Sequence, residues 1–442
     1  MPQRLSLCLV LAVAFASGAI AQQDRKSMVL NDKKHVEADP LWVYNDLEKG
    51  IAQAKESGKP LLIVFRCIPC HACAGFDAQV LAKAEKRMEE LMQKFVCVRI
   101  VYANGMDLQQ FQFDYDLSFA AFFMNADGTI YGRYGTRSDL KETERDLSME
   151  SFSKAMEGAL ELHKEYPANK AGLTPKRGPK VDVAKPELYP KLTKYTDAPD
   201  YEGQVVQTCI HCHMIRDAQR DVMRKAKKEM TDEVVFPWPM PEVVGLKLDP
   251  RERSTVTSVE AGSIAGKAGV KVGDEILKLN GQPILSIADV QFVLHHMPAS
   301  GGSVKATLKR GGETRDVGLS LPDGWRKVSD IHWRVSSWEF RRMGLGGMKA
   351  EDMSDADRRK AGLSTTQLAM HLAHVGQYGD HAVAKRAGFQ KGDIIIAWDG
   401  LTDRMTESEF LAYGAQQKKS GDLIKATILR GGKRMELRMT LP

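Results

Sequence analysis

The chain has 442 residues, a length that predicts about three domains. Hydrophobic residues make up 43% of it and charged residues 27%, which are values typical of a globular protein and exclude a disordered or fibrous chain. The net charge of +6, from 63 basic and 57 acidic residues, is a small excess for this length, and aromatic residues are only 7%. These values do not support nucleic-acid binding, which usually needs clustered basic residues or aromatic stacking surfaces.

Residues 1–21 have the pattern of a secretory signal peptide. Arg4 provides a positive start, Leu5–Ala16 is a short apolar run, and Ala19-Ile20-Ala21 is a small-residue cleavage site. The run is too short to span a membrane, and no later segment reaches about 18 apolar residues. An uncleaved anchor is the alternative. We expect export to a bacterial periplasm, the cell envelope or the medium, with no transmembrane segment after cleavage and conditions that permit disulfides.

The segment 35–165 carries alternating helix and strand patterns. The spacing of apolar residues predicts an amphipathic helix over 42–57, and the apolar run 61–65 predicts a buried central strand. This alternation predicts an α/β domain. The remaining elements expected here are a helix over 76–94, strands over 95–101, 120–124 and 129–134, and a closing helix over 148–165.

Two shorter segments follow. Residues 166–190 are rich in Pro, Gly and Lys, which predicts a linker. Residues 191–241 form a short segment that we expect to be mostly helical and that holds a second group of cysteines.

The remainder of the chain repeats one pattern. Ala-Gly-x-x-x-Gly-Asp begins at Ala268 and again at Ala387, and each copy ends in Leu-Pro. The offset of about 120 residues has almost no gap, so two copies of one β-rich domain are expected. We call them the first repeat, 243–322, and the second repeat, 343–442, with a connector over 323–342.

Six of the seven cysteines lie beyond the leader, all in the first half of the chain, and five of them fall in two tight clusters. A disulfide-stapled scaffold would scatter them. Clusters at this spacing indicate redox or cofactor chemistry. The sixth, Cys97, lies in a predicted strand and is expected to be a core thiol.

The first cluster follows a Lys-Pro and an apolar strand and precedes a helix, an order that resembles the thioredoxin fold. A cysteine at a helix N-terminus has a lowered thiol pKa. Two overlapping pairs compete here: Cys67-Ile68-Pro69-Cys70, which looks like the thioredoxin Cys-Gly-Pro-Cys, and Cys70-His71-Ala72-Cys73. The spacing from Phe65 in that family favours Cys70 as nucleophile and Cys73 as resolving thiol, with Cys67 as an auxiliary thiol and His71 able to stabilise a thiolate when protonated.

Two features depart from the thioredoxin pattern. Val64 stands where thioredoxin has a buried acid, and Ser118 or Phe119 stands where it has a cis-proline. The alternative to a redox site is therefore a thioredoxin-shaped domain with a stable disulfide or a bound metal and no turnover.

The second cluster, Cys209-Ile210-His211-Cys212-His213, fits the attachment motif of c-type haem. This resemblance implies thioethers at both cysteines and His213 as a ligand of the haem iron. The Trp238-Pro239-Met240-Pro241 stretch resembles the methionine loop of small cytochromes c, so Met240 is the expected sixth ligand. The alternatives are zinc bound by the two cysteines with His211 or His213, or a bare disulfide.

Each repeat resembles bacterial PDZ domains of the kind attached to envelope serine proteases. A PDZ groove adds a peptide as a strand and holds its carboxylate on backbone N–H groups of a Gly-containing loop. The resemblance places these loops at Gly245 and Leu246 in the first repeat and at Leu345 and Gly346 in the second. The alternative is a PDZ fold that only packs against its neighbours. No Gly-x-Ser-x-Gly stretch accompanies the repeats.

The whole pattern resembles exported bacterial multidomain proteins: an α/β thioredoxin-like domain, a short mostly helical CxxCH segment and two β-rich PDZ-like domains. It implies a thiol–disulfide or electron-transfer protein, a candidate oxidoreductase, whose PDZ domains recruit a protein or peptide client. The alternative is a non-enzymatic envelope scaffold in which the PDZ pair carries the function.

Overall fold

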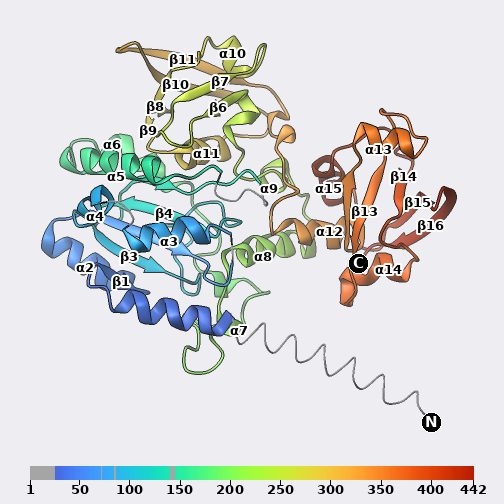
Figure 1. Ribbon diagram of the computed structural model, residues 1–442, viewed down its shortest axis with the longest axis horizontal. Coiled ribbons are helices and arrows are strands. Elements are labelled where there is room, and N and C mark those ends of the chain that lie inside the picture. Colours follow the sequence, from blue (N-terminus) through green and yellow to red (C-terminus); the bar gives the residue numbers. More distant parts are fainter. Residues whose placement is uncertain (1–24, 71, 84–85, 140–144) are drawn as a thin grey trace. The chain divides into compact units, whose positions relative to one another are not determined.

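The computed structural model describes residues 25–70, 72–83, 86–139 and 145–442, so the expected leader and His71 lie outside the described residues. The chain forms two compact units, which are described separately (Figure 1). The first unit comprises Met1–Gln219 and Trp238–Pro322, and the second comprises Arg220–Pro237 and Asp323–Pro442. Within the described ranges, no helix is long and apolar enough to cross a bilayer.

The first unit contains a five-stranded sheet with the order β1-β3-β2-β4-β5. Strands β1, β3 and β2 are parallel, β4 is antiparallel to β2, and β5 is antiparallel to β4. The apolar run predicted as a central strand is β2, in the middle of the sheet, and the other three predicted strands are confirmed. The strands are β1 (Trp42–Tyr44), β2 (Leu61–Arg66), β3 (Val96–Ile100), β4 (Phe119–Met124) and β5 (Ile130–Tyr134).

The helices of this five-stranded domain differ from the expectation at two places. The predicted helix over 42–57 begins with strand β1, and α2 starts only at Leu47, after the Asp46 side chain caps it. The predicted helix over 76–94 is two helices, the first ending at Lys83 in a left-handed conformation. The helices are α2 (Leu47–Ser57), α3 (Ala74–Ala82), α4 (Lys86–Met92) and α5 (Met149–Lys164).

Apolar clusters cover both faces of the sheet because successive side chains of a strand point to opposite sides. Leu62 and Val64 of β2 pack with α3 and α5 on one face. Leu61, Ile63 and Phe65 pack on the other face with residues of the second cysteine segment, including Ile210. The second cysteine segment therefore packs on this face of the sheet.

Residues 166–241 are neither a free spacer nor a separate domain. Lys176 in the predicted linker is 1% exposed, and the backbone N–H of Leu108 donates to the Ala184 carbonyl. The short helices here are α6 (Lys170–Leu173), η1 (Thr174–Arg177), η2 (Pro186–Leu188), α7 (Val205–Thr208), α8 (Cys212–Lys225), α9 (Asp232–Val235) and η3 (Pro241–Val244). The part of this segment up to Ala218 packs against the five-stranded sheet instead of standing alone.

The first repeat has a four-stranded sheet, in the order β11-β10-β8-β9, and a separate pair formed by β6 and β7. Its elements are β6 (Leu246–Leu248), β7 (Val256–Val259), α10 (Ile264–Lys267), β8 (Glu275–Leu279), β9 (Gln282–Pro283), α11 (Ile287–His295), β10 (Gly302–Arg310) and β11 (Glu313–Leu321).

The second repeat, in the second unit, has a five-stranded sheet in the order β12-β13-β14-β15-β16. The connector 323–342 contains a short 3-10 helix, η4, and the first part of helix α12. The elements of this part are η4 (Trp325–Val328), α12 (Ser337–Leu345), β12 (Met348–Asp352), α13 (Asp355–Lys360), β13 (Met370–Val375), η5 (Gly379–Ala382), α14 (Val383–Arg386), β14 (Ile394–Trp398), α15 (Glu407–Gln416), β15 (Leu423–Arg430) and β16 (Lys433–Thr440).

Each repeat contains the same kind of ion pair, between an arginine and a buried aspartate. Arg310 donates to both oxygens of Asp274, at 2.6 and 2.7 Å, and to the Gly269 carbonyl. The second repeat has the same three bonds, from Arg430 to Asp393 at 2.7 and 2.8 Å and to the carbonyl of Gly388. These equal contacts agree with the repeat in the sequence.

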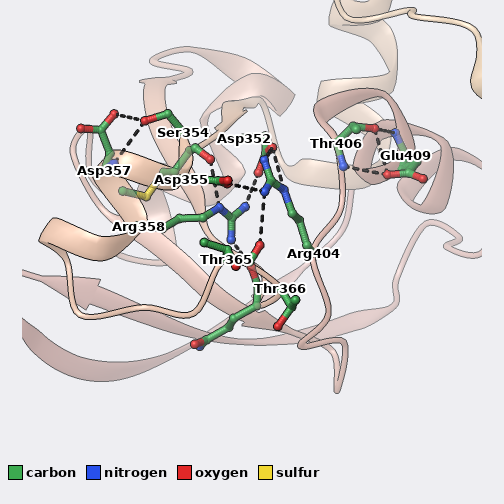
Figure 2. A network of polar contacts seen from close by, with 12 residues as sticks. Asp352, Ser354, Asp355, Asp357, Arg358, Thr365, Thr366, Arg404, Thr406 and Glu409 are labelled. Carbon is green, nitrogen blue, oxygen red and sulfur yellow. Dashed lines mark hydrogen bonds and ion pairs between the residues drawn. The ribbon is translucent and has the colours of Figure 1, made fainter.

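The second repeat differs by a longer connection between its first two strands, residues 353–369, which carries α13. Arg358 and Arg404 both bind the Asp352 carboxylate at the end of β12 and hold this connection (Figure 2). Arg404 also binds Asp355 at 2.6 Å and, through its backbone N–H, the Thr366 carbonyl. The inserted segment is therefore an ordered part of the repeat.

Candidate functional site

A disulfide joins Cys67 and Cys70 directly after the central strand β2, with their Cα atoms 5.4 Å apart. The backbone N–H of Cys67 donates to the Ser118 carbonyl, and that of Cys70 donates to the Cys67 carbonyl. Both cysteines are half-buried. The loop thus presents a closed Cys-x-x-Cys ring at the end of the strand.

This pairing differs from the predicted couple of Cys70 and Cys73. Cys73 is 2% exposed and adopts a left-handed conformation, φ 58°, immediately before α3. That turn directs its side chain into the apolar cluster that includes Phe76. Because α3 starts only at Ala74, the disulfide lies in the preceding loop and not at the helix N-terminus. The likeness of Cys67-Ile68-Pro69-Cys70 to the thioredoxin Cys-Gly-Pro-Cys was the signal for the pairing seen here.

Arg66 holds the disulfide loop, a role that the sequence did not suggest. Its buried guanidinium donates to the carbonyl oxygens of Cys67 and Cys70, the latter at 3.0 Å, and to Ser118 at 3.1 Å. Its Nε lies 3.1 Å from Asp77 of α3. The loop is therefore fixed by a charged group beneath it.

His211 of the second cysteine motif lies beside the disulfide. Its Nδ1 is 3.2 Å from the Sγ of Cys67, and the two sulfurs and a ring nitrogen all lie within 4.8 Å of one another. Burial, together with the nearby His213 and Arg25, lowers the pKa of His211 to about 4. The imidazole is therefore neutral at neutral pH and keeps a nitrogen lone pair.

Asn104 brings His211 to this position. Its side-chain oxygen accepts the N–H of Ile210 at 2.7 Å, and its amide donates to the Thr208 carbonyl at 3.0 Å. Ile210 itself is fully buried in the apolar cluster on the sheet. A pocket forms where the two motifs meet, lined by Phe65, Arg66, Cys67, Ile100, Val101, Tyr102, Ile210, His211 and Cys212.

The two cysteines of the second motif are less accessible than the haem prediction requires. Cys209 is 8% exposed, and Cys212 packs on the apolar cluster of the sheet. Burial raises the pKa of each thiol to about 12, so both are protonated at neutral pH. As placed, the buried Cys209 is closed to a porphyrin vinyl group, whereas Cys212 lines the pocket beside His211.

The predicted iron ligands also have other contacts. The Nδ1 of His213 lies 3.6 Å from Asp217 on the same helix. The sulfur of Met240 accepts a hydrogen bond from the Thr136 hydroxyl at 3.3 Å, where the first repeat meets the five-stranded domain. We derive no step through a haem. Its presence stays a prediction, which an absorption spectrum of protein matured with haem-attachment machinery would test.

The zinc alternative is not assembled either. Among the residues that the structure describes, His, Cys, Asp and Glu donors converge at one place, which is the group of Cys67, Cys70 and His211. Its three residues come from two separate parts of the chain, the Cys67–Cys70 loop and His211, so spacing in the sequence did not indicate it.

The predicted peptide loop of the first repeat is involved in local contacts. The N–H of Gly245 donates to the Glu242 carbonyl at 2.9 Å, and Leu246 is 2% exposed within β6. Residues Ile287–Leu294 of the neighbouring α11 are all buried. This helix packs against β5 of the five-stranded domain, so its face is not open to a peptide.

The predicted loop of the second repeat is the end of a helix. Leu345 is the last residue of α12 and is fully buried, and the N–H groups of Gly346 and Gly347 both donate to the Arg341 carbonyl. Helix α12 also packs closely on α15, where a Cβ on Gly344 would lie 2.5 Å from the Gly414 backbone. These N–H groups are therefore not directed at a ligand in this structure.

Two segments match known protein families. Residues 42–126 match the family model described as thioredoxin-like, and residues 255–300 match the PDZ domain model. The chain contains a thioredoxin-like domain and a PDZ domain. The PDZ match covers the first repeat, and the PDZ assignment of the second repeat stays a prediction that the repeated arginine–aspartate contacts support.

Curated relatives are bacterial proteases. The chain is 30% identical over 151 residues to the periplasmic serine endoprotease DegP of Salmonella typhimurium and 29% identical to DegP of Escherichia coli K12, in each case over 34% of this chain and 27% of the relative. The match to the periplasmic pH-dependent serine endoprotease DegQ of Escherichia coli K12 is 28%, over 34% of this chain and 29% of the relative. The chain thus spans less than a third of the length of these relatives.

Solved structures of similar proteins include the HtrA-type protease AlgW with a decapeptide, at 16% identity and a TM-score of 0.21, over 31% of this chain and 47% of that one. A TM-score this low does not establish a similar overall structure.

Proposed function

We propose that this chain is an exported periplasmic protein that exchanges disulfides at Cys67 and Cys70. The observation that carries the proposal is the Cys67–Cys70 disulfide in a pocket beside the neutral His211, with Sγ and Nδ1 3.2 Å apart. The secretory pattern of residues 1–21 and the periplasmic relatives support the compartment.

The exchange proceeds in two steps with a partner dithiol. One partner thiolate attacks a sulfur of the disulfide, which forms a mixed disulfide and releases the other sulfur as a thiolate. The second partner thiol then resolves the mixed disulfide, so two electrons and two protons pass to Cys67 and Cys70. In the reduced protein, the neutral His211 accepts a hydrogen bond from the Cys67 thiol and so orients the sulfur for the reverse reaction, and the thiol proton leaves to solvent when the thiolate forms.

Alkylation in redox buffers tests this proposal. The full chain is equilibrated with mixtures of reduced and oxidised dithiothreitol, trapped with a maleimide, and its modified cysteines are mapped. We expect Cys67 and Cys70 to become reactive together, a Cys73→Ala variant to behave in the same way, and Cys67→Ser to lose the transition. A couple that maps to Cys70 and Cys73, or a disulfide that no dithiol reduces, would contradict the proposal.

A scaffold is the second candidate function, and one observation favours it. The thioredoxin-like domain packs its strand β5 against α11 of the PDZ domain, and Lys176 in the segment that follows it forms a buried ion pair with Asp289, as in a platform. In this case the purified chain would bind a client protein but would not reduce insulin disulfides, and the Cys67→Ser variant would bind as the unchanged chain does. Client binding itself rests on the PDZ match at residues 255–300.

A further inference from the structure

We propose that the reduced Cys67 and Cys70, together with His211, bind one Cu(I) ion, and that formation of the disulfide releases it. This rests on the proposed function, because the site exists only when the disulfide can be reduced. The residues come from two motifs that lie 144 positions apart in the chain.

The distances suit a shared ion. Bonds of about 2.3 Å to sulfur and about 2.0 Å to imidazole nitrogen place two donors of one ion roughly 3.5–4 Å apart. Cys67 Sγ and His211 Nδ1 are 3.2 Å apart, and all three donor atoms lie within 4.8 Å of one another. Breaking the sulfur–sulfur bond lets the two sulfurs move apart, so small shifts are enough to admit an ion.

Hydrogen bonds from buried side chains fix the backbone of both segments that carry the donors. Arg66 donates to the backbone carbonyl oxygens of both cysteines, and Asn104 binds the N–H of Ile210, the residue before His211. Contacts of this kind orient metal ligands and strengthen binding. The donors are therefore placed before an ion arrives.

The donor set favours Cu(I) over Zn(II). Soft thiolates select Cu(I), which is stable with three donors, whereas zinc needs a fourth ligand, from the protein in structural sites or from water in catalytic ones. In the described part of the chain, three donors converge and the pocket walls around them are mostly apolar, with Phe65, Ile100 and Val101 among them. A monovalent ion of low coordination number suits such a pocket.

The reaction balances in both directions. Binding of Cu(I) by the dithiol replaces two thiol protons, which leave to solvent. When a partner disulfide oxidises Cys67 and Cys70, it takes two electrons from their sulfurs, the new sulfur–sulfur bond removes two donors, and the copper stays Cu(I). His211 alone then remains, and the ion dissociates.

Competition with a Cu(I) chelator tests the inference. The full chain is reduced with a phosphine, its thiols are counted by alkylation of a sample, and Cu(I) is titrated anaerobically against bathocuproine disulfonate. We expect one equivalent to transfer to the protein and none to the disulfide form. His211→Ala should weaken binding about tenfold or more, while the matched variant of the adjacent ring, His213→Ala, should stay close to the unchanged protein.

The result separates this inference from the proposed function. Counted thiols at Cys67 and Cys70 without uptake of Cu(I) overturn the copper site and leave disulfide exchange standing. Equal losses in His211→Ala and His213→Ala overturn it as well, and so does Zn(II) that displaces Cu(I). A disulfide that only the phosphine reduces, in a protein that then binds Cu(I), contradicts the exchange function alone.

Discussion

Buried charges around Asp77 support the disulfide loop. Asp77 lies between Arg66, at 3.1 Å, and Arg99, at 2.8 Å, and Arg99 also binds Asp32 at 2.8 Å. These pairings raise the pKa of Arg99 above its usual value, against the effect of burial. The two carboxylates compensate the charges of the buried Arg66 and Arg99, in an interior where an unpaired charge is costly.

Replacement of Asp77 should destabilise this domain. Asp77→Asn leaves two buried guanidinium groups with less compensation, so we expect the free energy of unfolding to fall by about 3–5 kcal/mol in urea titrations. The control is Glu56→Gln, an exposed acid on α2, which should change it by less than about 0.5 kcal/mol. Equal effects of the two variants would show that the Asp77 network does not stabilise the fold.

The identity of the disulfide illustrates what residue patterns can and cannot predict. Both Cys67 with Cys70 and Cys70 with Cys73 satisfy Cys-x-x-Cys, and spacing from Phe65 favoured the second pair. The structure forms the first, because the helix begins only at Ala74 and Cys73 turns into the core. The start of a helix depends on packing of its first turn, which a motif does not contain.

Among the secondary-structure elements, the repeated arginine–aspartate pair connects a strand to a loop in each repeat. In the first repeat it joins the end of β10 to the turn before β8, and Asp274 also accepts the N–H of Lys271 at 2.8 Å. The Asp274 side chain is fully buried, whereas Arg310 is 23% exposed. The ion pair needs the Asp274 carboxylate in its ionised form, so the stabilisation that the pair gives to the fold should depend on pH.

Acid should weaken the first repeat through Asp274. Hydrogen bonds from Arg310 hold the pKa of Asp274 below its usual 3.8. The ionised carboxylate thus stabilises the fold fully above that value, and the stabilisation is lost as the pH falls through the lower folded pKa. Arg310→Met should lower the free energy of unfolding at neutral pH and lower it less at about pH 2 in urea titrations.

The matched control for this pH effect is Lys309→Met, which removes an adjacent and 53% exposed cation on β10. It should change the free energy of unfolding little at any pH. A loss in Arg310→Met that is the same in acid and at neutral pH would show that the variant acts through packing and not through the pKa of Asp274.

Short elements escaped prediction for a related reason. The strand β1 lies inside a stretch with helical spacing, and it is a strand because Trp42 and its neighbours pair with β3. Likewise, the Gly-rich stretch at Gly346 predicted a ligand loop, but it ends helix α12 after that helix packs on α15. In both cases contacts with distant residues overrode the local preference.

At the scale of the whole molecule, the first unit joins its thioredoxin-like and PDZ domains by a buried contact. Lys176 and Asp289 form an ion pair at 2.8 Å, each 1% exposed, and the Arg133 guanidinium lies 3.6 Å from the centre of the Phe292 ring. Burial lowers the pKa of Lys176. Gly132 permits this approach, since a Cβ there would lie 2.6 Å from the Leu285 side chain.

Removing one partner of this pair should destabilise both domains. Lys176→Met leaves Asp289 buried without its cation, and we expect a loss of about 3–5 kcal/mol in the hydrogen-exchange stability of β3 and of β10. The double variant Lys176→Met with Asp289→Asn removes both charges, keeps a side-chain oxygen for one of the backbone N–H groups of Arg133 and Leu285 that donate to Asp289, and should recover most of that loss. A loss confined to one domain, or a double variant no better than the single one, would contradict a shared folding unit.

Local sequence was sufficient for the features that depend on neighbours along the chain. The strands around 61–65 and 120–124, the helix over 148–165 and the duplicated sequence pattern all follow from spacing and composition. The tertiary structure alone decided which cysteines bond, that His211 meets Cys67, and that α11 is covered. The choice of cysteines depends on where α3 begins and on the packing of Cys73 in the core. The other two outcomes need residues more than a hundred positions apart to be held by burial and hydrogen bonds, as Asn104 holds Ile210, and spacing along a chain carries no record of such contacts.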